Sequence, residues 1–404
     1  MPRDHHASHL GLLRRLTGTH PGPVHAVVVP TYRPVEHLVT AVDLAARLGC
    51  ALLAVHGGLS DPAGILALAE QAGLRRCYLV RDSDALAGGG GFPVAMRPLH
   101  DPPLKQRRIA SGRNLGLAVA RLAGWSHVLF LDDDVRPADR GDALADGAGL
   151  KDPDGGRLGS TRELAADVAA AAAHLGRDVT VVGWRQRWYP DNSVVCHANR
   201  LAGNGQDCFV GGGMLLVEVT ERTPFFPHVY NEDWFFLFEP LRRNAAGRGG
   251  DTRQLVFDPF ADPRRAVDEE FGDVLGEGLL HLLHTAPGAP RDDLEATMCA
   301  PEHWAAELEH RRRLIGNVAT QLDEGTGREV DERTRKAALD SLASAAERLA
   351  EITAQELAGF VAAWRTDLGH WRDLMTRWHP VGSAQAAFDV LHMPYETTLA
   401  ERTD

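Results

Sequence analysis

The sequence predicts an α/β protein: a mostly parallel, doubly wound sheet with helices on both faces, followed by an all-helical C-terminal region. Over residues 24–265, short apolar segments that fit buried strands alternate with segments of helical periodicity, which is typical of βαβ units. From about residue 266 onward, long amphipathic segments replace this alternation. We therefore expect an N-terminal extension over residues 1–23, an α/β domain over residues 24–265 and a helical region over residues 266–404.

The composition is that of a soluble globular protein. Apolar residues make up 44% and charged residues 24% of the chain, and no stretch is long and apolar enough to span a membrane. The formal net charge of −12 argues against binding to nucleic acid or to an anionic membrane surface. The five cysteines are scattered, and the N-terminus lacks the apolar segment of a signal peptide. We expect reduced thiols and a cytoplasmic location.

Strands and helices are predicted to alternate from residue 25. We expect strands at 25–30, 51–55 and 77–80, and helices at 35–48 and 63–72. The first strand ends in the polar turn Thr31-Tyr32-Arg33-Pro34, whose proline suits the start of a helix. Four consecutive glycines at 88–91 predict a loop.

A helix over 111–123 comes next, with Arg113 and Asn114 near its start. A helix N-terminus beside arginines is a plausible phosphate-facing surface, and an ordinary solvated basic helix end is an equally good interpretation.

The segment 127–131 is predicted to be a strand buried on both faces, and Asp132, Asp133 and Asp134 follow it directly. Open α/β sheets bind ligands at the carboxyl ends of their strands. Three adjacent carboxylates repel one another, so a bound Mg²⁺ or Mn²⁺, which prefers oxygen ligands and bridges to phosphates, would explain them. An acidic surface turn is the alternative.

The second half of the α/β domain is less regular. We expect loops at 138–159 and 191–206, a helix at 161–174, and strands at 179–184 and 209–219. The last strand contains Gly211, Gly212 and Gly213, and glycine within a strand indicates a bulge or a close approach to the backbone.

Acidic and aromatic residues are mixed at 230–234, ahead of a helix predicted at 235–243. Asn231 is a candidate cap of this helix. Glu232 and Asp233 would favour the helix dipole in its first turn, or they could be partly buried acids with raised pKa values.

The C-terminal region is predicted to hold helices at 292–322, 332–349 and 353–378, after a helical segment with His281 and His284 on one face. Trp364, Trp371 and Trp378 recur every seven residues and form one helical face. This face is expected to pack against the α/β domain or against a second subunit of a homo-oligomer.

Five of these segments, in this order, resemble motifs of GT-A glycosyltransferases of the family-2 type. They are V-V-V-P-T-Y-R-P, S-G-R-N-L-G-L-A-V-A-R, H-V-L-F-L-D-D-D, G-G-G-M-L-L and N-E-D-W, and they span roughly residues 24–241. The resemblance implies a GT-A fold and the transfer of a sugar from a nucleoside-diphosphate sugar to an acceptor hydroxyl. It does not extend to the C-terminal helices.

The resemblance also implies roles for individual residues on the donor side of the site. Thr31, Tyr32 and Arg33 would hold the base and ribose, and Arg113 and Asn114 would lie beside the nucleotide.

The acidic motif carries the metal in this family. Asp132 and Asp134 would coordinate Mn²⁺ or Mg²⁺ together with the diphosphate, and Asp133 would face the ribose or the sugar. His281 or His284 could complete the metal site.

The remaining motifs concern the acceptor. Gly211 to Gly213 would form the floor of the sugar and acceptor pocket. Asp233 would be the catalytic base of an inverting enzyme, with Glu232 as the alternative.

One position departs from the family pattern. The second strand usually ends with an aspartate that contacts uracil, but here V-H-G-G-L-S follows and the first acid is Asp61. UDP, GDP, dTDP and ADP sugars therefore all stay possible, and the acceptor is not indicated.

Three other functions remain open. If no base acts at residue 233, a retaining GT-A transferase fits better. A sugar nucleotidyltransferase is disfavoured because the P-T-Y-R-P turn lacks glycine. A catalytically silent scaffold that assembles through its helices is disfavoured by the acidic motifs.

Overall fold

The computed structural model describes residues 8–18, 20–87, 104–138, 160–187, 192–205, 209–286, 288, 291–325 and 330–398. Its strands are β1 (Arg14–Arg15), β2 (Ala26–Thr31), β3 (Ala51–His56), β4 (Cys77–Arg81), β5 (His127–Leu131), β6 (Val135–Pro137), β7 (Val181–Arg187), β8 (Val210–Glu218), β9 (Ala246–Gln254) and β10 (Glu396–Thr397). Its α-helices are α1 (Val39–Leu48), α2 (Pro62–Gln71), α3 (Asp82–Ala87), α4 (Leu104–Ala123), α5 (Thr161–Ala172), α6 (Val194–Leu201), α7 (Glu232–Arg242), α8 (Arg264–Thr285), α9 (Arg291–Met298), α10 (Pro301–Asp323), α11 (Glu332–Glu351), α12 (Ala354–Arg377) and α13 (Ala384–Val390), with short 3-10 helices at Leu10–Leu12 and Val35–Leu38.

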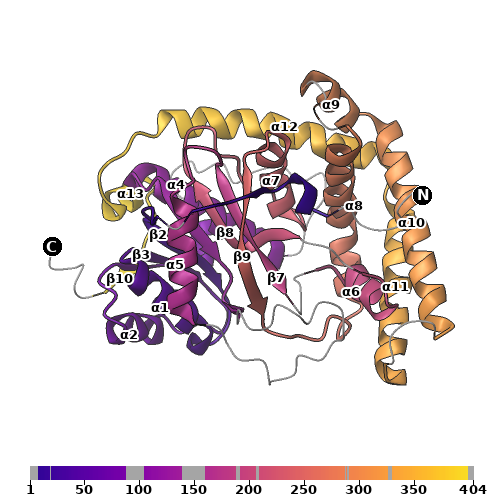
Figure 1. The fold of residues 1–404 in the computed structure, drawn as a ribbon, viewed down its shortest axis with the longest axis horizontal. Helices are drawn as coiled ribbons and strands as arrows, with labels where there is room; N and C mark the ends of the chain where they lie inside the picture. The colour runs from indigo at the N-terminus through magenta and orange to yellow at the C-terminus, as the bar shows by residue number, and fades with distance from the viewer. Residues whose placement is uncertain are drawn as a thin grey trace.

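The strands form one mixed sheet, and most of its neighbours are parallel (Figure 1). The order is β1-β9-β7-β8-β5-β2-β3-β4-β10, with β6 paired to β9. β8 runs antiparallel to both β5 and β7, and the short strands β6 and β10 are also antiparallel to their partners. The predicted α/β class and mostly parallel sheet are confirmed.

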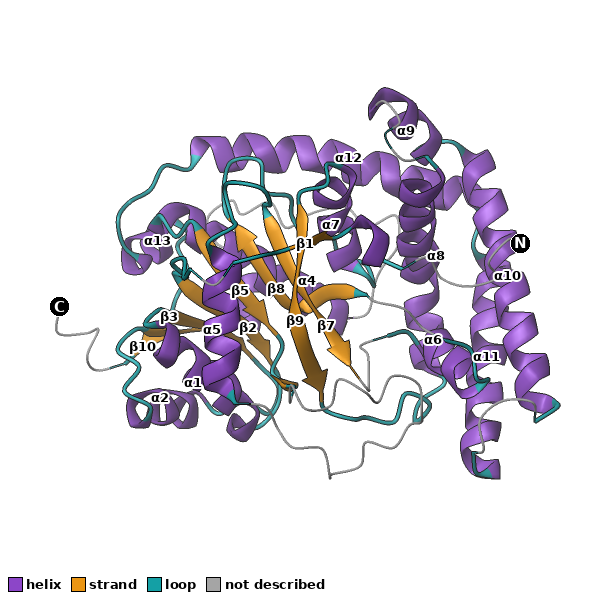
Figure 2. Cartoon of the chain, viewed as in Figure 1, coloured by secondary structure: helices purple, strands orange, loops and turns teal. Residues whose placement is uncertain are grey.

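Helices cover both faces of the sheet, as predicted (Figure 2). Successive residues of a strand point to opposite faces, so Ala26 and Val28 of β2 belong to one core and Val27 and Val29 to the other. The second core is closed by α1, α2 and α5. The first is closed by α4 and α7 and continues without interruption into the C-terminal helices.

Several predicted elements differ from the structure. Residues 192–205 were expected in a loop but include α6, whose cap is the Ser193 hydroxyl, which accepts a hydrogen bond from the N–H of Cys196. The strand β9 was not predicted, and the helix expected over 292–322 is broken between α9 and α10. The 88–91 loop and residues 139–159 of the next expected loop lie outside the described residues.

The C-terminal region packs against the α/β domain, which is one of the two partners that were expected for its tryptophan face. The Trp364 ring meets Phe235 of α7 edge-on, at 4.9 Å between centroids, and the Trp371 indole N–H donates to the Thr223 carbonyl (2.9 Å). Figure 1 shows α12 running across the molecule from the side of α10 and α11 to α13. The region is not purely helical, because its short strand β10 extends the sheet beside β4.

Two further expectations concern the cysteines and membrane-spanning segments. Cys50, Cys77, Cys196 and Cys299 are free thiols. Within the described part of the chain, no helix combines the length and apolarity needed to cross a membrane.

Candidate active site

A cavity of about 560 Å³ opens at the carboxyl ends of β2 and β5. From β2 the chain adds β3 and β4 on one side and later places β5 on the other, so the strand order reverses between β2 and β5. Such a reversal splays the connecting segments apart and leaves a crevice, which is where open α/β sheets bind ligands. The topology therefore places the Asp132–Asp134 motif at the predicted kind of site.

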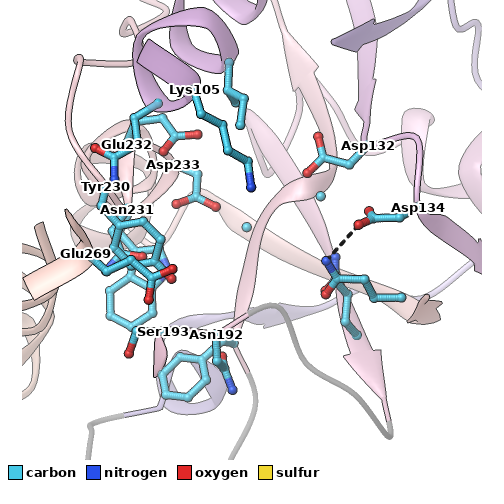
Figure 3. A pocket seen from close by; sticks show the side chains of 18 of the residues that line it. Lys105, Asp132, Asp134, Asn192, Ser193, Tyr230, Asn231, Glu232, Asp233 and Glu269 are labelled. Atoms are coloured by element: carbon cyan, nitrogen blue, oxygen red, sulfur yellow. Dashed lines mark hydrogen bonds between the residues drawn. The ribbon is translucent and has the colours of Figure 1, made fainter. Parts of the chain in front are cut away.

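The cavity has two acidic walls (Figure 3). One comes from the sheet and carries Asp132 and Asp134; the other comes from α7 and α8 and includes Glu232, Asp233 and Glu269. Figure 3 shows these two groups facing each other across the open space. Ten carboxylates and four basic side chains line the cavity in all.

Asp133 and Asp134 share one arginine and each has a further partner. Asp133 is buried and accepts hydrogen bonds from the Thr31 hydroxyl (2.8 Å) and from the Arg33 guanidinium (2.9 Å). Asp134 lies 2.9 Å from the same guanidinium and accepts a bond from the Gln254 amide (3.2 Å). These contacts offset the repulsion between adjacent carboxylates. Thr31 and Arg33 therefore form one cluster with Asp133 and Asp134.

Arg113 joins the two walls. Its guanidinium donates to Asp132 (2.9 and 3.2 Å) and to Glu232, and its side chain is 3% exposed. Burial alone would lower the pKa of this guanidinium, but Asp132, Glu232 and Asp233 outweigh burial and raise it above its ordinary value. The arginine therefore stays charged and fixes the distance between the walls.

Arg113 reaches the site from the middle of α4, because that helix begins at Leu104 and not near residue 111. The expectation of a phosphate-facing helix N-terminus at Arg113 and Asn114 is therefore wrong. Asn114 is buried, and its side-chain amide exchanges two hydrogen bonds of 2.8 Å with the backbone of Phe226. It does not line the cavity.

Glu232 and Asp233 stand in the first turn of α7. Asp233 Oδ2 accepts a hydrogen bond from the backbone N–H of Gly212 (2.6 Å), and no hydrogen bond from the described residues reaches its Oδ1. Burial raises the pKa of the Glu232 carboxyl to about 8, although Arg113 opposes that shift. Asn231 precedes the helix but makes no capping bond with its side chain.

The three glycines of β8 make room for side chains that cross the strand. A Cβ on Gly211 would lie 2.3 Å from Asp233 Oδ2, one on Gly212 would lie 2.3 Å from Arg113 Cζ, and one on Gly213 would lie 2.1 Å from Gln186 Nε2. These separations are far below van der Waals contact. The glycines therefore form a floor on which Asp233 and Arg113 rest, which gives the predicted close approach a physical cause.

Several residues that line the cavity were not predicted from the sequence. Lys105 extends into the cavity (Figure 3), and among the cations that line it within the described residues it alone has no carboxylate partner. Gln254 comes from β9, and Glu269, Asp273 and Glu277 come from α8. The basic run at 105–108 was the only local signal for any of them.

Two side chains beside the cavity carry a buried polar atom that has no protein partner among the described residues. The Tyr32 hydroxyl and the Gln254 Oε1 atom are buried beside the cavity and have no hydrogen-bond partner in the described structure. Buried polar groups are normally paired, so water or a bound ligand could satisfy these two atoms. Burial also raises the pKa of the Tyr32 phenol, which keeps it a donor.

His281 and His284 do not reach the aspartates. His281 shares a hydrogen bond with Glu307 (2.7 Å), and His284 shares one with the Ser8 carbonyl (2.7 Å); neither lines the cavity. The prediction that one of them completes the metal site at Asp132 and Asp134 is therefore wrong.

The described residues offer one set of three potential metal ligands with their ligand atoms within 4.8 Å of one another, namely Cys196, Asp273 and Glu277. Arg311 already neutralises both of those carboxylates. Asp132 and Asp134 offer oxygen donors, which Mg²⁺ and Mn²⁺ prefer, and they too are paired with arginines, Asp132 with Arg113 and Asp134 with Arg33. A comparison with models of known protein families and with curated protein sequences finds no match for this chain.

Proposed function

We propose that this protein is a metal-dependent glycosyltransferase with a GT-A fold, which moves a sugar from a nucleoside-diphosphate sugar to an acceptor hydroxyl. The observation that supports the proposal best is the cavity at the β2–β5 reversal, where Asp132 and Asp134 face Glu232 and Asp233. One wall suits a metal-bound diphosphate, and the other suits an acceptor that must lose a proton.

The donor would lie along the sheet wall. Tyr32 and Gln254 offer unsatisfied polar atoms for a base or ribose, and Lys105 offers an unpaired ammonium for the diphosphate. A bound Mg²⁺ or Mn²⁺, held by Asp132 and Asp134, would neutralise the negative charge that develops on the leaving group. Arg113 would hold Asp132 in place for this role.

Asp233 is the proposed base. In the transfer, the acceptor oxygen bonds to the anomeric carbon, the bond from that carbon to the diphosphate breaks, and the acceptor proton passes to Asp233. Its Oδ2 is fixed by Gly212, which leaves Oδ1 free to take the proton. Glu232 is engaged with Arg113 and would position that arginine.

The test measures nucleotide binding and turnover separately. Thermal unfolding is followed with UDP, GDP, dTDP or ADP, each with and without MnCl₂, for the wild type and for Asp134→Asn. A ligand at 100 times its dissociation constant stabilises the folded state by about 2.7 kcal/mol, so one nucleotide should raise Tm by several degrees and only with metal. Asp340→Asn, on the exposed face of α11, is the matched control.

Turnover of the matching nucleotide sugar is then measured. We expect Asp134→Asn to lose the metal-dependent shift and Asp233→Asn to keep the shift but lose transfer. If no nucleotide shifts Tm in the presence of metal and no nucleotide sugar is consumed, the proposal is wrong. If Asp233→Asn keeps full transfer, the inverting mechanism fails and a retaining transferase becomes the better proposal.

A further inference from the structure

We infer that α8 and α10 form a clamp on the turn at residues 230–231, which directly precedes the helix that carries the proposed base. Asn231, Asp273 and Arg311 are its positioning residues. The catalytic consequence rests on the proposed function, whereas the geometry stands on contacts among described residues. The clamp would give the C-terminal helices, which lie outside the family resemblance, a direct part in the site.

The first contact starts at Asn231, which ends the turn before α7. Its backbone is left-handed (φ 63°), a conformation that non-glycine residues adopt at a cost. Its amide nitrogen donates to Asp273 Oδ1 of α8 (2.9 Å) in place of a capping bond to α7. The side chain therefore ties the turn to another helix.

The second contact fixes Asp273 itself. Arg311 of α10 is 1% exposed, and its guanidinium donates to Asp273 Oδ2 (2.6 Å). The same guanidinium binds Glu270 through two bonds of 2.8 Å and Glu277 through one of 2.8 Å. Each oxygen of Asp273 thus has its own partner, so the carboxylate cannot turn without breaking one of the two bonds.

The surface of α8 is also shaped to receive the turn. A Cβ on Gly272 would lie 2.2 Å from the Tyr230 carbonyl oxygen, and one on Gly276 would lie 3.1 Å from Asn231 Nδ2. Residues four apart lie on one helix face, so these glycines form a bare strip on which residues 230 and 231 rest. Steric fit and hydrogen bonding therefore hold the turn at the same place.

The turn sets the position of the base because Glu232 and Asp233 are the next two residues. Asp233 is held on its other side by Gly212 of β8. A shift of about 1 Å at a reacting group can cost about 100-fold in rate, so a loosened turn would slow the transfer without removing any reacting group.

The test compares two isosteric changes in α8 that each take one carboxylate from Arg311. Asp273→Asn leaves one acceptor oxygen for the two donors Asn231 and Arg311, so one of the two bonds that hold the turn is lost. Glu270→Gln leaves both bonds of Asp273 intact and lies outside the cavity lining. Both variants are assayed for kcat, for donor KM and for hydrogen–deuterium exchange of the backbone amides of residues 231–235.

We expect Asp273→Asn to lower kcat by about 10- to 100-fold with donor KM within about twofold, and to speed exchange at 231–235. Glu270→Gln should keep kcat within about twofold and leave that exchange unchanged. If Asp273→Asn does not fold, Asn231→Gly breaks the same link from the other side and suits the left-handed backbone. Equal kcat values in the two variants, or unchanged exchange at 231–235, would overturn the inference.

Failure of the proposed function would look different. In that case the wild type would consume no nucleotide sugar, while Asp273→Asn would still speed exchange at the start of α7. The clamp would then hold the start of α7 in place at a site with another function.

Discussion

Gly212→Ala tests the link between the glycine strand and the two walls of the cavity. The added methyl would lie 2.3 Å from both Cζ and Nη1 of Arg113, so the guanidinium would have to move. Arg113 is 3% exposed, and its bonds to Asp132 and Glu232 would break or lengthen. Overpacking of a buried position costs about 1–3 kcal/mol, which corresponds to a fall of a few degrees in Tm.

The loss of activity should exceed the loss of stability. Because Arg113 positions Asp132 and Glu232, we expect kcat to fall by about 100-fold at a temperature where the variant is fully folded by circular dichroism. Gly369→Ala in α12 is the control, since its new methyl would contact nothing within 4 Å and should stabilise the helix by about 0.5–1 kcal/mol.

A double-mutant cycle identifies the cause. Arg113→Lys removes the guanidinium that bonds Asp132 through Nη2 and Glu232 through Nη1, so Gly212→Ala should add little further loss in that background. Full additivity of the two losses would refute the reasoning, as would wild-type kcat in Gly212→Ala.

Three further predictions concern the same cavity. Burial raises the pKa of Glu232 from 4.5 to about 8, so its contribution to stability is complete below about pH 4.5 and is lost as pH rises through about 8; the fall in Tm between about pH 5 and pH 9 should be smaller in Glu232→Gln. His281→Ala should keep metal-dependent transfer within about twofold, because His281 bonds Glu307 outside the cavity, and a loss of metal dependence would restore it as a ligand. Lys105→Ala should raise donor KM by about tenfold, equal to about 1.4 kcal/mol of binding, and an unchanged KM would remove Lys105 from the donor site.

Local sequence patterns were sufficient to predict β5 and the acidic motif at its carboxyl end. The apolar residues of 127–131 match β5 over its whole length, and the three aspartates follow at the carboxyl end of the strand. The tryptophan stripe of α12 likewise faces the α/β domain. The continuous apolar run of β5 indicates burial on both faces, and the seven-residue spacing of the tryptophans indicates one buried helix face, so neither prediction needs knowledge of the packing partner.

Other elements depend on partners far away in the sequence. The strand β9 reads A-G-R-G-G-D-T-R-Q, which has neither apolar alternation nor β-branched residues apart from one threonine. It is a strand because it pairs with β7 on one side and with β1 and β6 on the other. Gln254 could therefore not be predicted as a neighbour of Asp134.

The site residues divide in the same way. Thr31 and Arg33 lie beside Asp133 and Asp134 because both segments follow adjacent strands, β2 and β5. Asn114 was assigned to the nucleotide because the resemblance places the R-N-L-G segment there. On a helix, however, neighbouring residues point in different directions, and Asn114 faces Phe226. His281 and His284 lie on one face of α8, and neither side chain lines the cavity that contains Asp132.

This contrast explains why the sequence indicated a donor and left the acceptor open. On the proposed function, the donor wall is built from contiguous residues at strand ends, and contiguous residues form motifs. The opposite wall takes Glu269, Asp273 and Glu277 from α8, spaced four apart, and such spacing is also typical of an ordinary charged helix face. Their role becomes visible only when α10 places Arg311 behind them and the turn at Asn231 in front.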